Sequence, residues 1–138
     1  MTRRTLAALL LAGLAAAGCG GNEGPIAGEL EVRLVTPNTD DRAILFRLIG
    51  AQTALTAPSG SGYRVLHGAS VPTGDTVRVL VIAPQSGHIA AGTILRIGVP
   101  DTRKAATYAA LVQEAASTAY ASRPPSGYLL TVVATGTP

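Results

Sequence analysis

The chain has 138 residues, with 11 lysines and arginines against 8 aspartates and glutamates, and a formal net charge of +3 at pH 7. Two of the basic residues are Arg3 and Arg4, and the largest basic cluster after them is the pair Arg103 and Lys104. Most of the chain is therefore close to neutral, which makes nucleic acid a poor candidate partner. A single cysteine excludes an intramolecular disulfide, so the fold must depend on a hydrophobic core.

Residues 1–18 have the organisation of an export signal. Arg3 and Arg4 form a positive n-region, an apolar run extends from Leu6 to Ala17, and small residues precede the cysteine. About 12 apolar residues make about 18 Å of helix, whereas the hydrocarbon core of a bilayer is about 30 Å thick. A permanent transmembrane helix is therefore not expected in this segment.

The residues Ala16-Ala17-Gly18-Cys19 resemble the lipobox of bacterial lipoprotein signal peptides, in which the cysteine is lipidated and becomes N-terminal. Lipoproteins usually have leucine three residues before the cysteine, where this chain has Ala16. The resemblance implies two or three acyl chains on Cys19, which would anchor the protein in the cell envelope. Gly20 stands where an aspartate often retains lipoproteins at the inner membrane, so the outer membrane is favoured in an organism that has one. The alternative is an ordinary secretory signal cut after residues 15–17.

The rest of the chain divides into a linker and one domain. Residues 19–27 are short, polar and glycine-rich, which predicts a flexible tether. Residues 28–138 have the length of a single domain. Alternating or β-branched segments predict strands at 28–35, 43–49, 63–67, 76–82, 93–99 and 128–133, with a doubtful strand at 52–56.

The segment 43–49 is the most apolar of these strands, and we expect it near the centre of a sheet. Alternation directs Ile44, Phe46 and Leu48 inward and Arg47 outward. Glycine or proline turns separate the strands, and no long helices recur between them. The expected fold is therefore an all-β antiparallel sandwich.

The segment 103–120 is ambiguous. Its alanine content and the spacing of Tyr108, Leu111, Val112 and Ala115 fit a helix, yet a strand here could complete a final hairpin with the strand at 128–133.

The order of the strands is similar to that of cohesin-like and related carbohydrate-binding β-sandwich domains, over residues 28–134. This resemblance implies a jelly-roll sandwich, and it favours a strand at 106–114. No calcium ligands or carbohydrate contacts can be carried over, because the surface strip of Trp and Tyr found in binders of crystalline polysaccharide is missing.

Two histidines are the candidates for catalysis. His67 ends a predicted strand and His88 lies in a loop, but neither belongs to an H-x-x-x-H or H-E-x-x-H spacing. The sequence therefore predicts no metal site and no cofactor. A small envelope hydrolase that uses His67 or His88 beside a serine or a carboxylate is kept as an alternative function.

The oxygen-bearing clusters have simpler interpretations. Asn38, Asp40 and Asp41 could supply calcium ligands, but they lack the EF-hand spacing and are better explained as turn residues, as is Asp75. No serine lies in a G-x-S-x-G nucleophile elbow, and loops account better for the four serines considered, Ser59, Ser61, Ser70 and Ser86.

The expected function is therefore that of a non-enzymatic, lipid-anchored envelope protein whose β-sandwich binds another protein or a glycan. Sandwich loops and sheet edges are common docking elements. A structural or assembly lipoprotein is a further alternative that the sequence does not separate from this one.

Overall fold

The computed structural model describes residues 23–69 and 75–136. The predicted signal peptide and the predicted lipidation site at Cys19 lie outside these residues. Within them no helix has the length and apolar character needed to cross a membrane.

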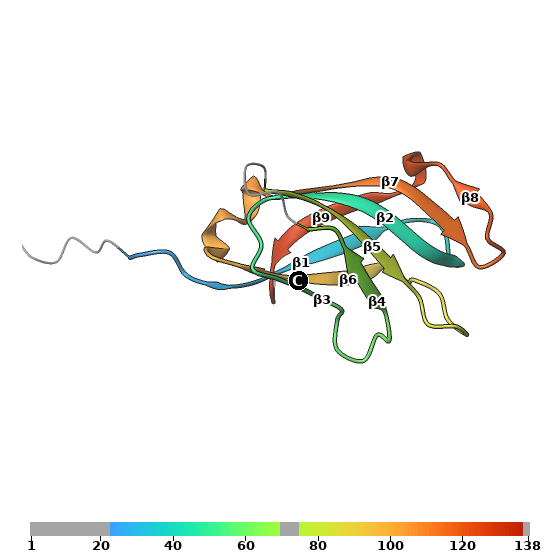
Figure 1. Ribbon diagram of the computed structural model, residues 1–138, viewed down its shortest axis with the longest axis horizontal. Helices are drawn as coiled ribbons and strands as arrows, with labels where there is room; N and C mark the ends of the chain where they lie inside the picture. The colour runs from blue at the N-terminus through green and yellow to red at the C-terminus, as the bar shows by residue number, and fades with distance from the viewer. Residues whose placement is uncertain (1–22, 70–74, 137–138) are drawn as a thin grey trace, which may run out of the picture.

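The described chain forms two antiparallel sheets that pack face to face (Figure 1). The strands are β1 (Gly28–Val35), β2 (Asp41–Ile49), β3 (Ala54–Thr56), β4 (Arg64–His67), β5 (Thr76–Ile82), β6 (Gly92–Val99), β7 (Ala109–Ser117), β8 (Ser122–Arg123) and β9 (Leu129–Ala134). One sheet has the order β3-β6-β1-β9 and the other has the order β4-β5-β2-β7-β8. The expected antiparallel β-sandwich is confirmed, and β2 lies at the centre of the five-stranded sheet as predicted.

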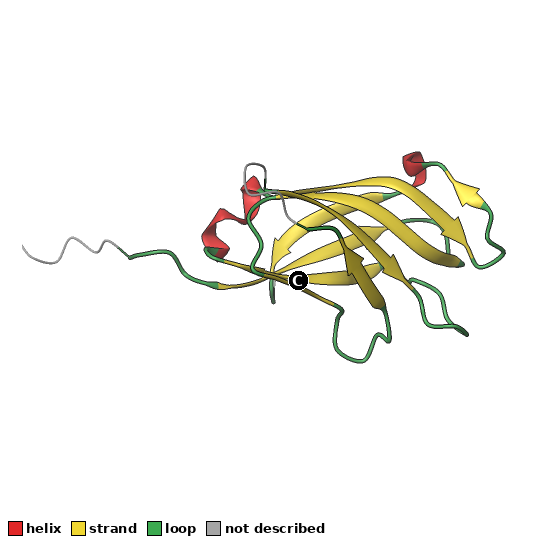
Figure 2. Ribbon diagram, in the orientation of Figure 1, coloured by secondary structure: helices red, strands yellow, loops and turns green. Residues whose placement is uncertain are grey.

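Two short 3-10 helices complete the fold, η1 (Thr102–Thr107) and η2 (Pro125–Gly127), at opposite ends of the sandwich (Figure 2). The sequence does not predict η2, whereas η1 overlaps the segment 103–120, for which a helix was one of the two interpretations. Asp101 caps η1, because its side chain accepts a hydrogen bond from the backbone N–H of Arg103.

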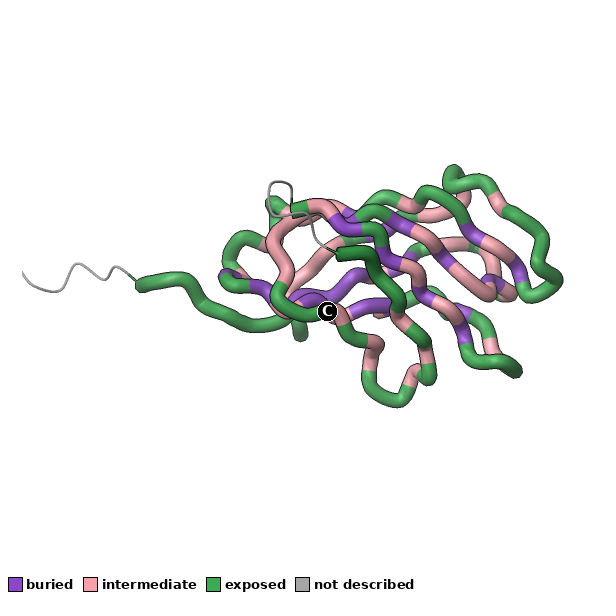
Figure 3. Tube along the Cα trace, in the orientation of Figure 1, coloured by how far each residue is buried: buried purple, intermediate pink, exposed green. Residues whose placement is uncertain are grey.

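The core lies between the sheets and is built from aliphatic side chains and one aromatic ring. Its buried positions alternate along the strands with more exposed ones (Figure 3). Ile44, Phe46 and Leu48 on β2 are fully buried, while Arg47 between them is exposed, as alternation predicts. On the facing sheet Leu30 and Val32 are fully buried in the same way. This period of two gives each sheet one inner face and one outer face.

The ambiguous segment 103–120 is a 3-10 helix followed by a strand. The strand favoured at 106–114 is present as β7, displaced to Ala109–Ser117, and the helix alternative does not hold beyond η1. The register shows why the pattern resembled a helix. Val112 pairs with Phe46, and Glu114 pairs with Leu45, so Gln113 is an extra residue in a β-bulge. The bulge interrupts the alternation of inward and outward side chains, and the apolar spacing then mimics a period of 3.6 residues.

Candidate functional site

The structure does not bring the two histidines into a catalytic arrangement. His67 is exposed at the end of β4, and its Nδ1 lies 3.0 Å from the carbonyl oxygen of Gly68. It borders a hollow of about 440 Å³ that Gln52 and Thr53 also line, and among the described residues of this hollow there is no serine or carboxylate. His88 is exposed in the loop between β5 and β6. The hydrolase alternative therefore has no geometric support in the described part of the chain.

The serines considered as nucleophiles are equally unsupported. Ser61 donates from its hydroxyl to the carbonyl of Pro58 at 2.7 Å, which stabilises the turn before β4. Ser59 and Ser86 are exposed in loops, and Ser70 lies outside the described residues.

The acidic cluster at the start of β2 is an ion-pair network. Asp41 is the first residue of β2 and is fully buried, so its interpretation as a turn residue is wrong. Arg123 on β8 donates from Nη1 to Asp41 Oδ1 at 3.0 Å, and from Nη2 to Asp40 Oδ1 at 2.7 Å. The hydroxyl of Tyr128 donates to the same Oδ1 of Asp41 at 2.6 Å. A guanidinium thus already supplies the positive charge that these carboxylates need.

A second network holds the N-terminal segment against the opposite end of the sandwich. Asp101 accepts hydrogen bonds from Arg103 Nε at 3.0 Å and from the backbone N–H of Ile26 at 3.3 Å. Arg103 also donates to the carbonyls of Glu23 and Gly24, at 3.2 and 2.9 Å. The hydrogen bonds from Arg103 lower the pKa of Asp101 to about 2. Residues 23–27 are exposed, yet they are hydrogen-bonded to the sandwich.

A hollow of about 570 Å³ lies at this same end between Gly50, Lys104 and Tyr108. The hydroxyl of Tyr108 donates to the carbonyl of Ala51, and burial raises the pKa of this hydroxyl above its usual value of 10. The hydrogen-bonding groups of Tyr108 and of Asp101 are therefore already used to hold the fold together.

The two outer faces of the sandwich differ in how their charges are arranged. On the four-stranded sheet, Arg33 pairs with Glu31 at 3.1 Å, and Arg96 reaches Glu29 at 3.6 Å and Glu31 at 3.7 Å. The hydroxyl of Thr93 also donates to Glu31. This face neutralises its own charges.

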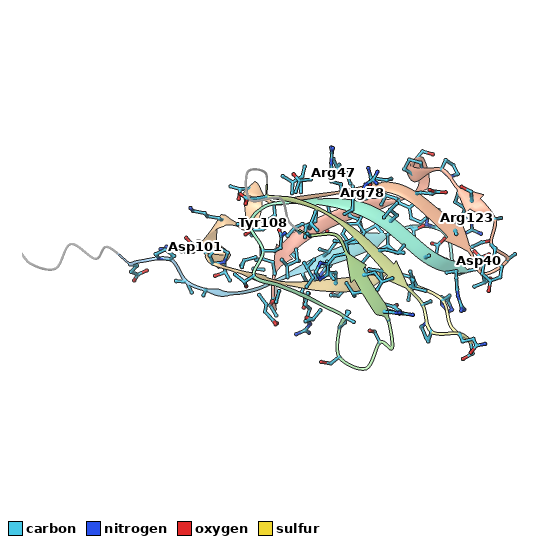
Figure 4. The ribbon with its side chains drawn as sticks, viewed as in Figure 1. Asp40, Arg47, Arg78, Asp101, Tyr108 and Arg123 are labelled. Carbon is cyan, nitrogen blue, oxygen red and sulfur yellow. The ribbon has the colours of Figure 1, made fainter. Side chains whose placement is uncertain are left out.

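The outer face of the five-stranded sheet carries a pair of arginines that is not neutralised. Arg47 on β2 and Arg78 on β5 are register partners, and both side chains are exposed (Figure 4). In the described residues neither guanidinium has an acidic partner or a hydrogen bond, although like charges directly opposite each other destabilise a sheet.

A row of leucines crosses the same face two residues away from the arginine pair. Leu66 on β4 is opposite Leu80 on β5, which is opposite Leu45 on β2. Leu66 is 42 % exposed, and the other two are half-buried. Across β2, Arg47 is opposite Leu111, which is 50 % exposed. We call this surface, formed by Arg47, Arg78, Leu45, Leu66, Leu80 and Leu111, the arginine face.

Alternation alone places Arg47 and Arg78 on the outward side of their strands, but the sequence does not show that the two strands are neighbours. The arginine face was therefore missed at the level of sequence. In the described residues no group of three or more His, Cys, Asp or Glu side chains could hold a metal ion. Comparison with protein-family models, with curated proteins and with solved structures finds no match.

Proposed function

We propose that this protein is a non-enzymatic, lipid-anchored protein of the cell envelope, and that its sandwich binds another protein through the arginine face. The observation that carries the proposal is the contrast between the two outer faces. One face pairs its charges internally, whereas the other leaves Arg47 and Arg78 unpaired beside partly exposed leucines. A surface that combines apolar side chains with arginine is typical of a docking site.

A protein fits this face better than a glycan does. Flat aromatic side chains are the usual platform for sugar rings, and the arginine face has none. The described aromatic residues lie elsewhere: Phe46 is in the core, Tyr63, Tyr108 and Tyr128 pack against the core, and Tyr120 is exposed in the turn after β7. Leucine and arginine side chains suit a polypeptide, which offers apolar groups and carboxylates together.

The anchor in this proposal is the lipid on Cys19. Each acyl methylene buried in the membrane contributes about 0.8 kcal/mol, and two or more chains give stable attachment. Treating cells with globomycin, which inhibits the lipoprotein signal peptidase, should slow the protein on a gel because the signal is retained. A Cys19→Ala variant should lose its attachment to membranes. Unchanged mobility with globomycin would overturn the anchoring part of the proposal.

Site-specific photo-crosslinking in intact cells tests the binding part. A photoreactive residue at Leu80, in the centre of the arginine face, is compared with one at Thr131, which is exposed on the other outer face. We expect a discrete protein adduct from position 80 and none from position 131. Failure to obtain any adduct from position 80, or equal adducts from both, would contradict the proposed use of this face.

A further inference from the structure

The described arginines fall into two groups according to whether the guanidinium has a partner. In five of them the guanidinium has a partner. Four pair with carboxylates, namely Arg33, Arg96, Arg103 and Arg123, and Arg42 donates to two backbone carbonyls. The other three have none in the described part of the chain, and these are Arg47, Arg64 and Arg78. The register places Arg64 opposite Ile82, whose side chain is on the outer side of β5, so all three lie on the same face.

The following inference about the partner rests on the proposed function of the arginine face. If a protein binds this face, the unpaired arginines define the chemistry of that protein. We infer that the partner is an acidic, amphipathic protein segment whose carboxylates bind Arg47 and Arg78 and whose apolar side chains cover the leucine row. Register partners in an antiparallel pair have their Cα atoms about 4.5–5.5 Å apart. Acidic residues at positions i and i+4 of a helix are about 5–6 Å apart, so one helix face can reach both guanidiniums.

The leucine row gives the segment its second requirement. Leu80 lies two residues from Arg78 along β5, which is about 7 Å in an extended strand. A helix presents neighbouring stripes of side chains at this separation, so an apolar stripe beside an acidic stripe matches the face. The row ends at Glu114 on β7, where an acidic partner would be repelled. The acidic stripe is therefore expected on the Arg47 side of the leucine row.

A second copy of this chain does not satisfy the same requirements. In a two-fold symmetric dimer whose axis passes through the arginine pair, the arginine pair of one copy would lie against that of the other. Four arginines without counter-charges would then be brought together, and like charges across an interface are strongly unfavourable. Such a dimer is therefore unfavourable, and the inference takes a different protein as the occupant.

Charge reversal on the face tests this inference in the full-length protein in cells. The photoreactive residue at Leu80 is combined with Arg47→Glu and Arg78→Glu, and the control is Lys104→Glu, a matched reversal of an exposed cation at η1. We expect adduct yield to fall about tenfold or more with the arginine reversals and to be unchanged with Lys104→Glu. Circular dichroism of each variant confirms that the sandwich is folded, and Arg47→Gln with Arg78→Gln serves as a milder pair that should also lose adduct.

The outcomes separate the inference from the proposed function. A protein adduct that persists in both the reversed and the neutralised variants would overturn the acidic partner but leave protein binding on this face intact. Absence of any adduct in the wild-type chain would overturn both. An adduct that is a lipid, a glycan or a second copy of this chain would also overturn the inference. A captured partner whose own Glu→Arg change restores crosslinking to the reversed face would establish it.

Discussion

The hydroxyl of Tyr128, the residue directly before β9, donates a 2.6 Å hydrogen bond to Oδ1 of Asp41, a carboxylate with no solvent-exposed surface at the start of β2. Asp41 belongs to the five-stranded sheet and β9 to the four-stranded sheet, so this bond ties the two sheets together at one end of the sandwich. Arg123 Nη1 donates to the same oxygen at 3.0 Å. A buried carboxylate depends on such partners, because an uncompensated buried charge is strongly destabilising.

Removal of this hydroxyl should therefore destabilise the protein. We expect Tyr128→Phe to lower the free energy of unfolding by about 1.5–3 kcal/mol, the usual contribution of a hydrogen bond to a charged group. Tyr120→Phe is the matched control, because Tyr120 is 80 % exposed and should change stability by less than about 0.5 kcal/mol. Urea denaturation of both variants measures the difference, and equal effects would contradict a structural role for the Tyr128 hydroxyl.

The Asp101 network predicts a pH-dependent stability. The pKa of Asp101 is lowered to about 2 in the folded protein, from an ordinary value of 3.8. A depressed folded-state pKa stabilises the fold above the ordinary value, and this contribution is lost as the pH falls towards the folded value. Asp101→Asn should therefore be less stable than the wild type at neutral pH, and the difference should shrink between about pH 4 and pH 2.

Thermal unfolding at a series of pH values measures this effect. Asp75→Asn is the control, since the exposed carboxylate of Asp75 makes no side-chain hydrogen bond or ion pair in the described residues. A difference between Asp101→Asn and the wild type that stays constant down to pH 2 would contradict the assignment of this effect to Asp101.

Position 50 requires glycine for two reasons, its backbone conformation and the closeness of the Tyr108 ring. Its φ angle is +127°, and a Cβ atom there would lie 2.2 Å from Cδ1 of Tyr108. Gly60 also has a positive φ, +75°, but no atom lies within 4 Å of its Cβ position. We expect Gly60→Ala to lower the free energy of unfolding by about 1 kcal/mol, through backbone strain alone. Gly50→Ala should cost about 1–3 kcal/mol more, because the Tyr108 ring must move. Chemical denaturation of both variants tests this, and equal costs would show that the ring yields freely.

The unpaired arginines predict a stabilising substitution. Because Arg47 and Arg78 repel each other across β2 and β5, Arg78→Gln should raise the free energy of unfolding by about 0.2–1 kcal/mol. The gain should decrease at high salt, which screens exposed charges. Arg96→Gln is the opposite case. It removes ion pairs to Glu29 and Glu31 and should therefore lower the free energy of unfolding. A loss of stability in Arg78→Gln would mean that this arginine supports the fold.

Local alternation was sufficient to predict most of the strands, because the inward side chains of a strand such as β2 are apolar in every second position. It failed at β7 because the bulge at Gln113 shifts the alternation by one residue. It also could not predict η1, whose cap depends on a bond between Asp101 and Arg103.

The candidate site could not be predicted from the sequence, for a different reason. Arg47 and Arg78 are neighbours only because β2 pairs with β5 in one particular register, and the sequence does not state which strands pair. The same holds for Asp41, which acquires its role from Arg123 and Tyr128, more than 80 residues away in the chain. Long-range pairing, which is a property of the whole fold, decides both sites.

The hydrogen bonds from Arg103 to Glu23 and Gly24 also set how far the sandwich could stand from a membrane. Only four peptide steps separate Cys19 from Glu23, a span of at most about 14 Å when fully extended. A lipid on Cys19 would hold the η1 end close to the bilayer, and the described N-terminal segment leaves that end along the long axis of the sandwich (Figure 1). The plane of the arginine face would then be roughly perpendicular to the bilayer surface, and a partner could reach this face without being blocked by the membrane.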